Sequence, residues 1–230
     1  MRPIWPALIF KQPQWFLAKL GLWRCIKKMA PHLSGCVLDV GSGKSPYARL
    51  IRYTRRVQIE IDARRRPDVQ ASALSLPFRE ESFDSVLCTE VLEHLSDPQR
   101  AVNEIARVLK PGGVALISAP MGWALHYEPH DYFRFTHYGL QHLLSSSGLR
   151  AEQTLSSGGL LRIVGVHLAH TLYKLGMFIF LPFELCRPLR KFLAACLALP
   201  VNLVFAVLAR IAECFGTRFH MGWVVRARKA

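Results

Sequence analysis

The chain has few cysteines, and their spacing lacks the patterns that carry a structural metal or a disulfide framework. Its 230 residues include six cysteines, all scattered, and no two of them form a C-x-x-C pair. We therefore expect neither a zinc-finger type of site nor a disulfide-stapled fold, and a reducing compartment is the simpler assumption. Internal repeats and low-complexity tracts are also missing.

Acidic residues are scarce as well. Sixteen Asp and Glu stand against 30 Lys and Arg, which gives a formal net charge of +14 at pH 7. Such a balance indicates an anionic partner. Because 51% of the residues are hydrophobic, an anionic membrane surface is favoured over nucleic acid. The first residues, M-R-P-I-W-P, lack the apolar stretch and cleavage site of a signal peptide, so we expect a cytoplasmic protein.

The segment around which the chain is organised reads C-V-L-D-V-G-S-G, from Cys36 to Gly43. A short apolar run closed by glycines predicts a buried parallel strand that enters a tight turn. Gly41 and Gly43 permit backbone conformations that a β-carbon forbids, and they let a ligand approach the main chain. Ser45-Pro46 then predicts the start of a helix. A strand, a glycine turn and a helix in this order place a nucleotide at the carboxyl end of the strand.

Three kinds of ligand compete for this turn. A phosphate-binding loop requires G-x-x-x-x-G-K-[ST], and its first glycine falls on Leu38. A dinucleotide site requires G-x-G-x-x-G, and its third glycine falls on Pro46. The remaining ligand is S-adenosylmethionine, whose cationic amino-acid end suits the acid Asp39. V-L-D-V-G-S-G resembles the first motif of the class I S-adenosylmethionine-dependent methyltransferases; a plain strand-to-helix turn is the alternative.

A second acid follows about 20 residues later. Residues 57–61 (V-Q-I-E-I) predict a strand that ends at Asp62, and an acid at this point accepts hydrogen bonds from ribose hydroxyls. Asp62 is therefore the predicted ribose ligand. Glu60 competes, but strand alternation assigns it to another side. The arginines at positions 64–66 predict a solvated charge run, or an NADP phosphate site as the sharper alternative.

Two further segments support the resemblance, which is to type 11 methyltransferases. F-D-S-V-L-C-T-E-V-L-E-H-L, from Phe83, and R-V-L-K-P-G-G-V-A-L-I, from Arg107, are similar to family motifs at the expected distances. Where the family has aspartate before L-P-F, this chain has Ser72. Glu93 and His94 could form an acid–base pair but are expected to brace a turn. The resemblance implies S-adenosylmethionine as the cofactor and these contacts to it: Asp39, Gly41, Ser42, Gly43, Asp62, Ser72, Ala73, Cys88, Thr89 and Glu90.

The fold that the resemblance implies is α/β, a Rossmann-like, doubly wound sheet of seven strands with the last one antiparallel. We expect one methyltransferase domain over residues 1–230, built from a helix at 14–29, a cofactor-binding core at 36–158 and a final strand at 220–228. A hydrophobic helical insertion at 160–215 precedes that strand. Its broken apolar runs with basic edges predict helices lying on an anionic bilayer; a hairpin through the membrane and a buried subdomain or dimer interface are the alternatives.

Acceptor chemistry is expected in residues 120–136, which mix aromatic and titratable side chains after a strand end. The segment P-H-D-Y-F-R-F-T resembles a stretch of methyltransferases of bacterial cell-surface glycan and lipid pathways. The candidates for activating an acceptor are His130, Asp131 and His126, and the candidates for binding it are Trp123, Tyr127, Tyr132 and Arg134. Alternatively, His130 and Asp131 only pin the loop. A metal site of His126, His130 and Asp131 is possible by residue type, but we expect no metal.

These observations predict transfer of the methyl group of S-adenosylmethionine to a hydroxyl or similar nucleophile. The expected acceptor is small, lipid-linked or glycan-type, and the protein is expected to be peripheral at the inner face of the cell membrane. RNA methylation and a non-catalytic, membrane-associated scaffold are the alternative functions. The sequence does not set the oligomeric state.

Overall fold

The computed structural model describes residues 15–181, 187–212 and 218–230. Three parts of the sequence predictions lie outside these ranges. They are the first residues, where no signal peptide is expected, the first residue of the expected 14–29 helix, and parts of the 160–215 insertion. The chain divides into two compact units. We call Trp23–Ser156 with Gly222–Ala230 the sheet unit, and the described residues of Met1–Leu22 with Ser157–Met221 the helical unit. The expectation of a single domain stays a prediction.

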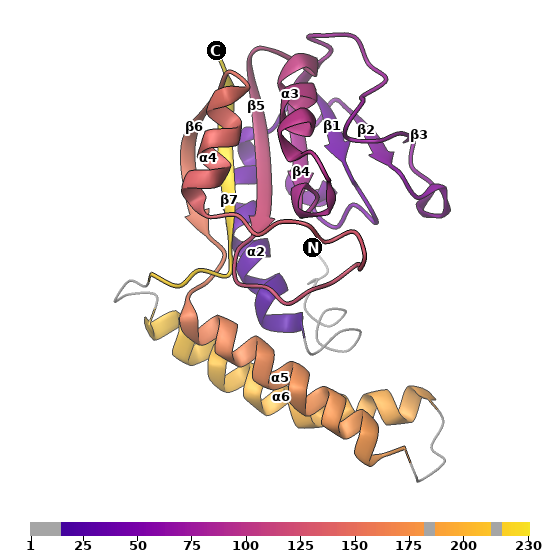
Figure 1. The fold of residues 1–230 in the computed structure, drawn as a ribbon, viewed down its shortest axis with the longest axis vertical. Helices are drawn as coiled ribbons and strands as arrows, with labels where there is room; N and C mark the ends of the chain where they lie inside the picture. The colour runs from indigo at the N-terminus through magenta and orange to yellow at the C-terminus, as the bar shows by residue number, and fades with distance from the viewer. Residues whose placement is uncertain (1–14, 182–186, 213–217) are drawn as a thin grey trace. The chain divides into compact units, whose positions relative to one another are not determined.

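The sheet unit is built on seven strands in the order β3-β2-β1-β4-β5-β7-β6 (Figure 1). The pairs among β1 to β5 are parallel, whereas β7 runs antiparallel to both β5 and β6. This confirms the expected Rossmann-like α/β sheet with its last strand antiparallel. The strands are β1 (Cys36–Val40), β2 (Arg55–Glu60), β3 (Val69–Gln70), β4 (Phe83–Thr89), β5 (Leu109–Pro120), β6 (Leu149–Ser156) and β7 (Gly222–Lys229).

Helices α3 (Pro98–Val108) and α4 (His137–Ser146) lie beside each other on one face of this sheet (Figure 1). As predicted, Asp97 caps α3: its carboxylate accepts a hydrogen bond from the backbone N–H of Arg100 at 3.0 Å, and Pro98 occupies the first turn. The apolar face of α3, including Val102 and Ile105, is fully buried in the core. This packing places α3 in the core against β5.

Two local predictions were wrong. After the glycine turn the chain forms only a 3₁₀ turn, Ala48–Leu50, and the Ser45 hydroxyl donates to the Asp39 carboxylate instead of capping a helix. Ser45 itself has φ +45°, outside helical geometry. Strand β2 ends at Glu60, one residue earlier than expected, because Asp62 begins a 3₁₀ turn of its own, Ala63–Arg65.

The helical unit contains α5 (Leu160–Ile179) and α6 (Arg187–Ala212), which pack along each other (Figure 1). Small residues allow their close approach: a β-carbon on Gly165 would lie 2.5 Å from the Phe205 side chain, and one on Gly176 would lie 2.9 Å from Ala194. A helical block therefore precedes the final strand, as predicted. Helix α2 (Phe16–Met29) crosses the boundary between the units in sequence.

Candidate cofactor and acceptor site

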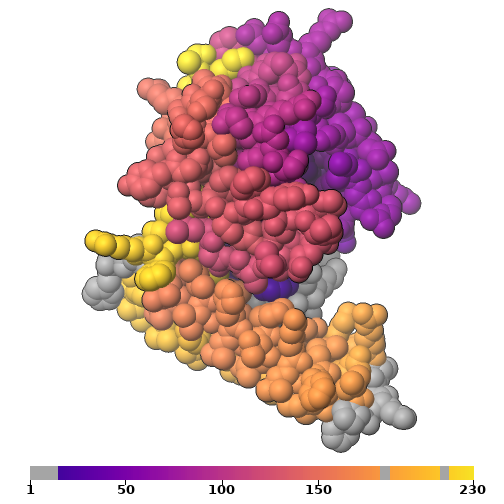
Figure 2. Space-filling model, in the orientation of Figure 1, coloured from indigo at the N-terminus to yellow at the C-terminus, as the bar shows by residue number. Residues whose placement is uncertain are grey.

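A cavity of about 790 Å³ opens at the carboxyl ends of β1, β2 and β4. In Figure 2 the surface of the sheet unit is hollowed between its purple and its magenta parts. The walls include nine of the residues that the sequence predicted: Gly41, Gly43, Asp62, Ser72, Ala73, Glu90, Tyr127, His130 and Tyr132. Other described residues on the walls were not predicted as site residues, among them Glu60, His94 and Leu95.

The two glycines shape the floor of this cavity in different ways. Gly41 has φ +60°, and a β-carbon there would lie 2.5 Å from the Val91 side chain, so this position has no room for one. Gly43 has φ +52°, but no atom lies within 4 Å of the place where its β-carbon would be. The backbone at Gly43 is thus exposed to the cavity, where a ligand could approach the main chain closely.

Glu60 ends β2 directly beside this turn. One of its carboxylate oxygens accepts a hydrogen bond from the Gly43 N–H at 3.0 Å, and the other accepts one from the Ile61 N–H at 2.9 Å. A carboxylate has room for further donors on its remaining lone pairs. Glu60 therefore combines the position at a strand end with a fixed orientation against the glycine turn.

Asp62, the predicted ribose ligand, also lines the cavity but is engaged elsewhere. Its carboxylate accepts a hydrogen bond from the Arg64 backbone N–H at 3.1 Å and from the Arg64 Nε at 2.8 Å. These hydrogen bonds from Arg64 lower the pKa of Asp62. The arginine run at positions 64–66, predicted to be solvated, thus has one member, Arg64, hydrogen-bonded to Asp62.

Four predicted cofactor residues lie behind the walls. Asp39 is buried in β1, where its carboxylate faces Arg56 Nη1 at 3.4 Å and accepts from Ser45. Burial raises the pKa of Asp39 to about 6, against the effects of Ser45 and Arg56. Cys88 is fully buried, and Thr89 ends β4. The buried Ser42 hydroxyl has no hydrogen-bond partner among the described residues, so a polar ligand group reaching the turn would satisfy it.

On the expected adenine side, Ser72 and Ala73 line the cavity as predicted. The Ser72 hydroxyl, however, accepts a hydrogen bond from the Leu74 N–H at 3.2 Å. Ser72 therefore stabilises its own turn, and it lacks the carboxylate found at this position in the resembled family.

Glu90 follows β4 with φ +53°. The hydroxyl of Ser118, on the neighbouring strand β5, donates to its carboxylate at 2.7 Å. Burial raises the pKa of Glu90 to about 7. The pKa of Tyr47 is raised too, first by burial of its side chain and then by the nearby charge of Glu90. Of these two residues, Glu90 lines the cavity, so its wall carries a buried carboxyl group with a raised pKa.

The loop after β5 is braced by Asp131 and Arg134. Their side chains form two parallel hydrogen bonds of 2.7 Å each, and Arg134 also donates to the carbonyl oxygens of Trp123 and Ala124 at 3.0 Å. The Arg134 guanidinium, through its hydrogen bonds, holds the pKa of Asp131 well below its usual range. Neither side chain lines the cavity, so their observed contacts match the loop-pinning alternative.

The aromatic end of the cavity comes from the same loop. Tyr127, His130 and Tyr132 line it, and His130 Nδ1 lies 3.1 Å from the Tyr132 hydroxyl. Among these, His130 presents a titratable ring to the space that an acceptor would enter. Trp123 and His126 are partly buried behind them.

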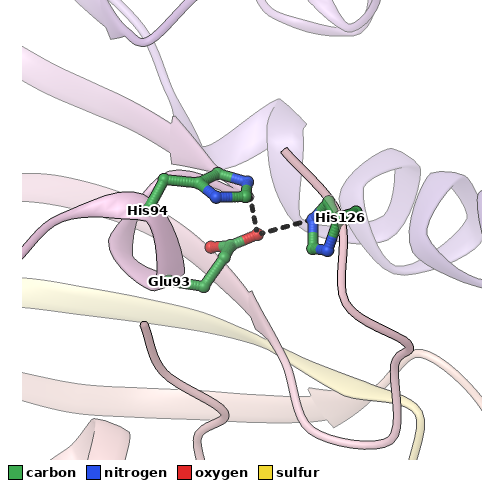
Figure 3. Close-up of side chains that lie close together, drawn as sticks. All are labelled: Glu93, His94 and His126. Atoms are coloured by element: carbon green, nitrogen blue, oxygen red, sulfur yellow. Dashed lines mark ion pairs between the residues drawn. The ribbon is translucent and has the colours of Figure 1, made fainter. Parts of the chain in front are cut away.

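Sequence reasoning treated Glu93 and His94 as bracing residues, and the structure brings both against His126 (Figure 3). Glu93 Oε1 lies 3.6 Å from His94 Nε2 and 3.9 Å from His126 Nε2. His126 reaches this place only because the loop after β5 folds back over the turn after β4, where the backbone N–H of Tyr132 donates to the Glu93 carbonyl at 2.8 Å. No local sequence signal could have predicted that Glu93, His94 and His126 lie together.

Comparison with known proteins agrees with this geometry. The family described as a methyltransferase domain matches residues 38–117. An uncharacterized methyltransferase of Mycobacterium sp. (strain KMS) is 36% identical over 131 residues, which cover 51% of this chain and 50% of the relative. The chain thus spans about half the length of this relative and of two others from Mycobacterium that it matches at similar identity.

Solved structures show the same fold at low sequence identity. The S-adenosylmethionine-dependent methyltransferase of Mesorhizobium loti superposes with a TM-score of 0.57 at 17% identity, covering 93% of this chain and all of that one. The [4+2]-cyclase SpnF superposes with a TM-score of 0.58 at 20% identity, covering 91% of this chain and 80% of that one.

The fold and the glycine-lined cavity define a Rossmann-like nucleoside-binding protein. Residues 38–117 match the methyltransferase-domain family, and the sheet has the fold of class I S-adenosylmethionine-dependent methyltransferases, which confirms the resemblance seen in the sequence. S-adenosylmethionine is the cofactor of this class. The residues present fit it, since the open backbone at Gly43, the Glu60 carboxylate and the unpartnered Ser42 hydroxyl lie together at the turn.

Proposed function

We propose that the protein transfers the methyl group of S-adenosylmethionine to a hydroxyl or similar nucleophile of a small, lipid-linked or glycan-type acceptor. The observation that carries this proposal is the cavity that joins the glycine turn and the β2 tip to an aromatic, histidine-bearing end. Methyl transfer from a sulfonium is an in-line displacement, so the protein mainly positions the two reactants and excludes water.

In this proposal the ribose ligand is Glu60 rather than Asp62. Glu60 stands at the end of β2 with its carboxylate fixed by Gly43, whereas Asp62 is occupied by Arg64. The Gly43 backbone lets the cofactor approach, and Ser42 offers its hydroxyl. His130 is the candidate base on the acceptor side, because it lines the cavity and its ring is held beside Tyr132.

The helical unit supports action at a membrane surface. Within the described residues, α6 alone is long and apolar enough to cross a bilayer, and only 22% of its most apolar stretch is buried. Large apolar side chains are exposed along both helices, for example Phe178 on α5 and Val207 on α6, and Arg187, Arg190, Lys191 and Arg210 add positive charge. We infer that the protein is cytoplasmic and that these helices lie against the anionic inner face of the cell membrane.

The experiment that tests this function supplies the purified protein with S-adenosylmethionine labelled in the methyl group. Separated lipid, glycan, RNA and protein fractions of the host cell serve as acceptors. We expect label in the lipid or glycan fraction, and a Glu60→Gln variant as the control should transfer much less. Label in RNA alone would show that the acceptor is a nucleic acid and not a lipid or glycan. A net charge of +14 is also compatible with binding to RNA. Cofactor binding without label in any fraction would favour the non-catalytic scaffold.

A further inference from the structure

Three potential metal ligands meet at the edge of the cavity. Glu93 and His94 come from the 3₁₀ turn Leu92–His94 after β4, and His126 comes from the loop after β5 (Figure 3). One ligand atom from each residue lies within 4.8 Å of the others. Figure 3 shows both imidazole rings beside the same carboxylate oxygen of Glu93.

The hydrogen bonds of the two histidines orient both Nε2 atoms for coordination. His94 Nδ1 lies 2.7 Å from the carbonyl oxygen of His130, which only accepts, so this nitrogen carries a proton. His126 Nδ1 faces the Ala124 carbonyl at 3.2 Å and the Asp131 carboxylate at 3.3 Å, both acceptors as well. In the neutral rings the lone pair is therefore on Nε2, directed toward Glu93.

Glu93 supplies an independent observation. Its residue is 0% exposed, and neither carboxylate oxygen accepts a hydrogen bond from any described residue. A buried, unpaired carboxylate is costly, and two nitrogen lone pairs facing it increase the repulsion. A divalent cation between the three groups removes both costs.

We propose that Glu93, His94 and His126 bind one divalent transition-metal ion, with Zn²⁺ as the best fit. Two imidazole nitrogens and one glutamate oxygen form the ligand set of catalytic zinc sites that keep a fourth position open. The second contacts of the histidines match such a site, because metal-binding imidazoles donate their other N–H to a carbonyl or carboxylate. Here the His130 carbonyl and the Asp131 carboxylate have this role.

The location suggests what the ion does, and this part rests on the proposed function. His94 lines the cavity between Glu90 and the aromatic loop residues. An acceptor hydroxyl at the open metal position would have a lowered pKa and would release its proton to His130, the candidate base on the same cavity wall. Its oxygen then forms the bond to the methyl carbon as the carbon–sulfur bond breaks, and that electron pair stays on sulfur, giving S-adenosylhomocysteine.

The test measures Zn²⁺ binding without cofactor or acceptor. Untagged protein is stripped with a chelator and titrated with Zn²⁺ by calorimetry, and the bound metal is then counted after dialysis. We expect one Zn²⁺ per chain. Glu93→Gln and His126→Ala should each weaken binding by about 100-fold or more, because losing only a supporting partner of a ligand costs about 10–100-fold. The matched control is His142→Ala, since His142 is an exposed histidine on α4.

Three results would overturn the site. The first is that the wild type binds no stoichiometric Zn²⁺. The second is that both ligand variants bind Zn²⁺ as tightly as the wild type, and the third is that the His142→Ala control loses as much Zn²⁺ affinity as they do. If Glu93→Gln fails to fold, His126→Ala still decides, because His126 belongs to an irregular loop and is only partly buried. Titration of the same samples with S-adenosylhomocysteine reports separately on the proposed function, so failure of one proposal does not imply failure of the other.

Discussion

The carboxylate of Glu60 accepts a hydrogen bond from the backbone N–H of Gly43 at 3.0 Å, which ties the end of β2 to the glycine turn after β1. Both residues line the cavity. Adjacent parallel strands end at the same edge of a sheet, so this contact joins two parts of the cavity that lie 17 residues apart in sequence.

The first prediction compares the two acids near the β2 end. Glu60→Gln should weaken S-adenosylhomocysteine binding by about 10- to 100-fold, because hydrogen bonds to a charged acceptor contribute about 1.5–3 kcal/mol. Asp62→Asn should change it by less than about 3-fold, since its exposed pairing with Arg64 contributes little. Isothermal titration measures both. A larger loss at Asp62 than at Glu60 would restore Asp62 as the ribose ligand.

The second prediction concerns the open backbone at Gly43. Gly43→Ala adds a β-carbon that points into the cavity, so cofactor binding should fall at least about 10-fold. Gly148→Ala is the matched control: Gly148 also has positive φ, +74°, and open space, but it does not line the cavity. Each variant should lose about 1–3 kcal/mol of unfolding free energy from backbone strain. Equal affinities for S-adenosylhomocysteine in the two variants would contradict this role of Gly43.

The third prediction follows from the buried acid in β1. Burial raises the pKa of Asp39 from its ordinary value of 3.8 to about 6. The folded state therefore binds this proton more tightly than the unfolded state. The resulting stabilisation, of about 3 kcal/mol, is fully present below pH 3.8 and is lost as the pH rises through 6.

Urea unfolding of the wild type and Asp39→Asn at several pH values between 4 and 7 isolates this effect. The free energy of unfolding of the wild type should fall relative to that of the variant as the pH rises. A difference between the two proteins that does not change with pH would show that Asp39 ionises normally.

The fourth prediction concerns the brace of the loop after β5. Arg134→Ala leaves the Asp131 side chain, which is 1% exposed, without its paired hydrogen bonds. The unfolding free energy should fall by about 2–3 kcal/mol. Arg150→Ala serves as the control, because Arg150 is 79% exposed and its pairing with Glu152 is long, at 3.9 Å. Chemical denaturation should place that control within about 0.5 kcal/mol of the wild type, and equal losses would argue against the brace.

The fifth prediction addresses the helical unit. Val207→Glu places a charge on an exposed apolar position of α6 and should reduce binding to anionic vesicles by about 10-fold, because a buried valine side chain contributes about 1.5–3 kcal/mol. Tyr138→Glu makes the same kind of change on α4, where Tyr138 is 72% exposed, and should leave binding nearly unchanged. Co-sedimentation with phosphatidylglycerol vesicles measures both. An unaffected Val207→Glu variant would contradict binding through α6.

Local signals in the sequence were enough to predict much of this fold. The run ending at Gly43 predicted β1 and its turn, and Asp97-Pro98 predicted the start of α3, because these signals act within a few residues. The choice between Glu60 and Asp62 depended on where β2 ends, and strand ends are set by pairing with β1 and β3. The cluster of Glu93, His94 and His126 arises from a loop that returns to β4, which only tertiary structure shows.

The most direct test of the account is a calorimetric titration of the folded wild-type protein with S-adenosylhomocysteine. Circular dichroism confirms the fold of the same sample. We predict saturable binding of one molecule per chain, with an affinity that drops in Glu60→Gln and Gly43→Ala. Absence of binding by protein that is shown to be folded would contradict the assignment of the cavity to this cofactor.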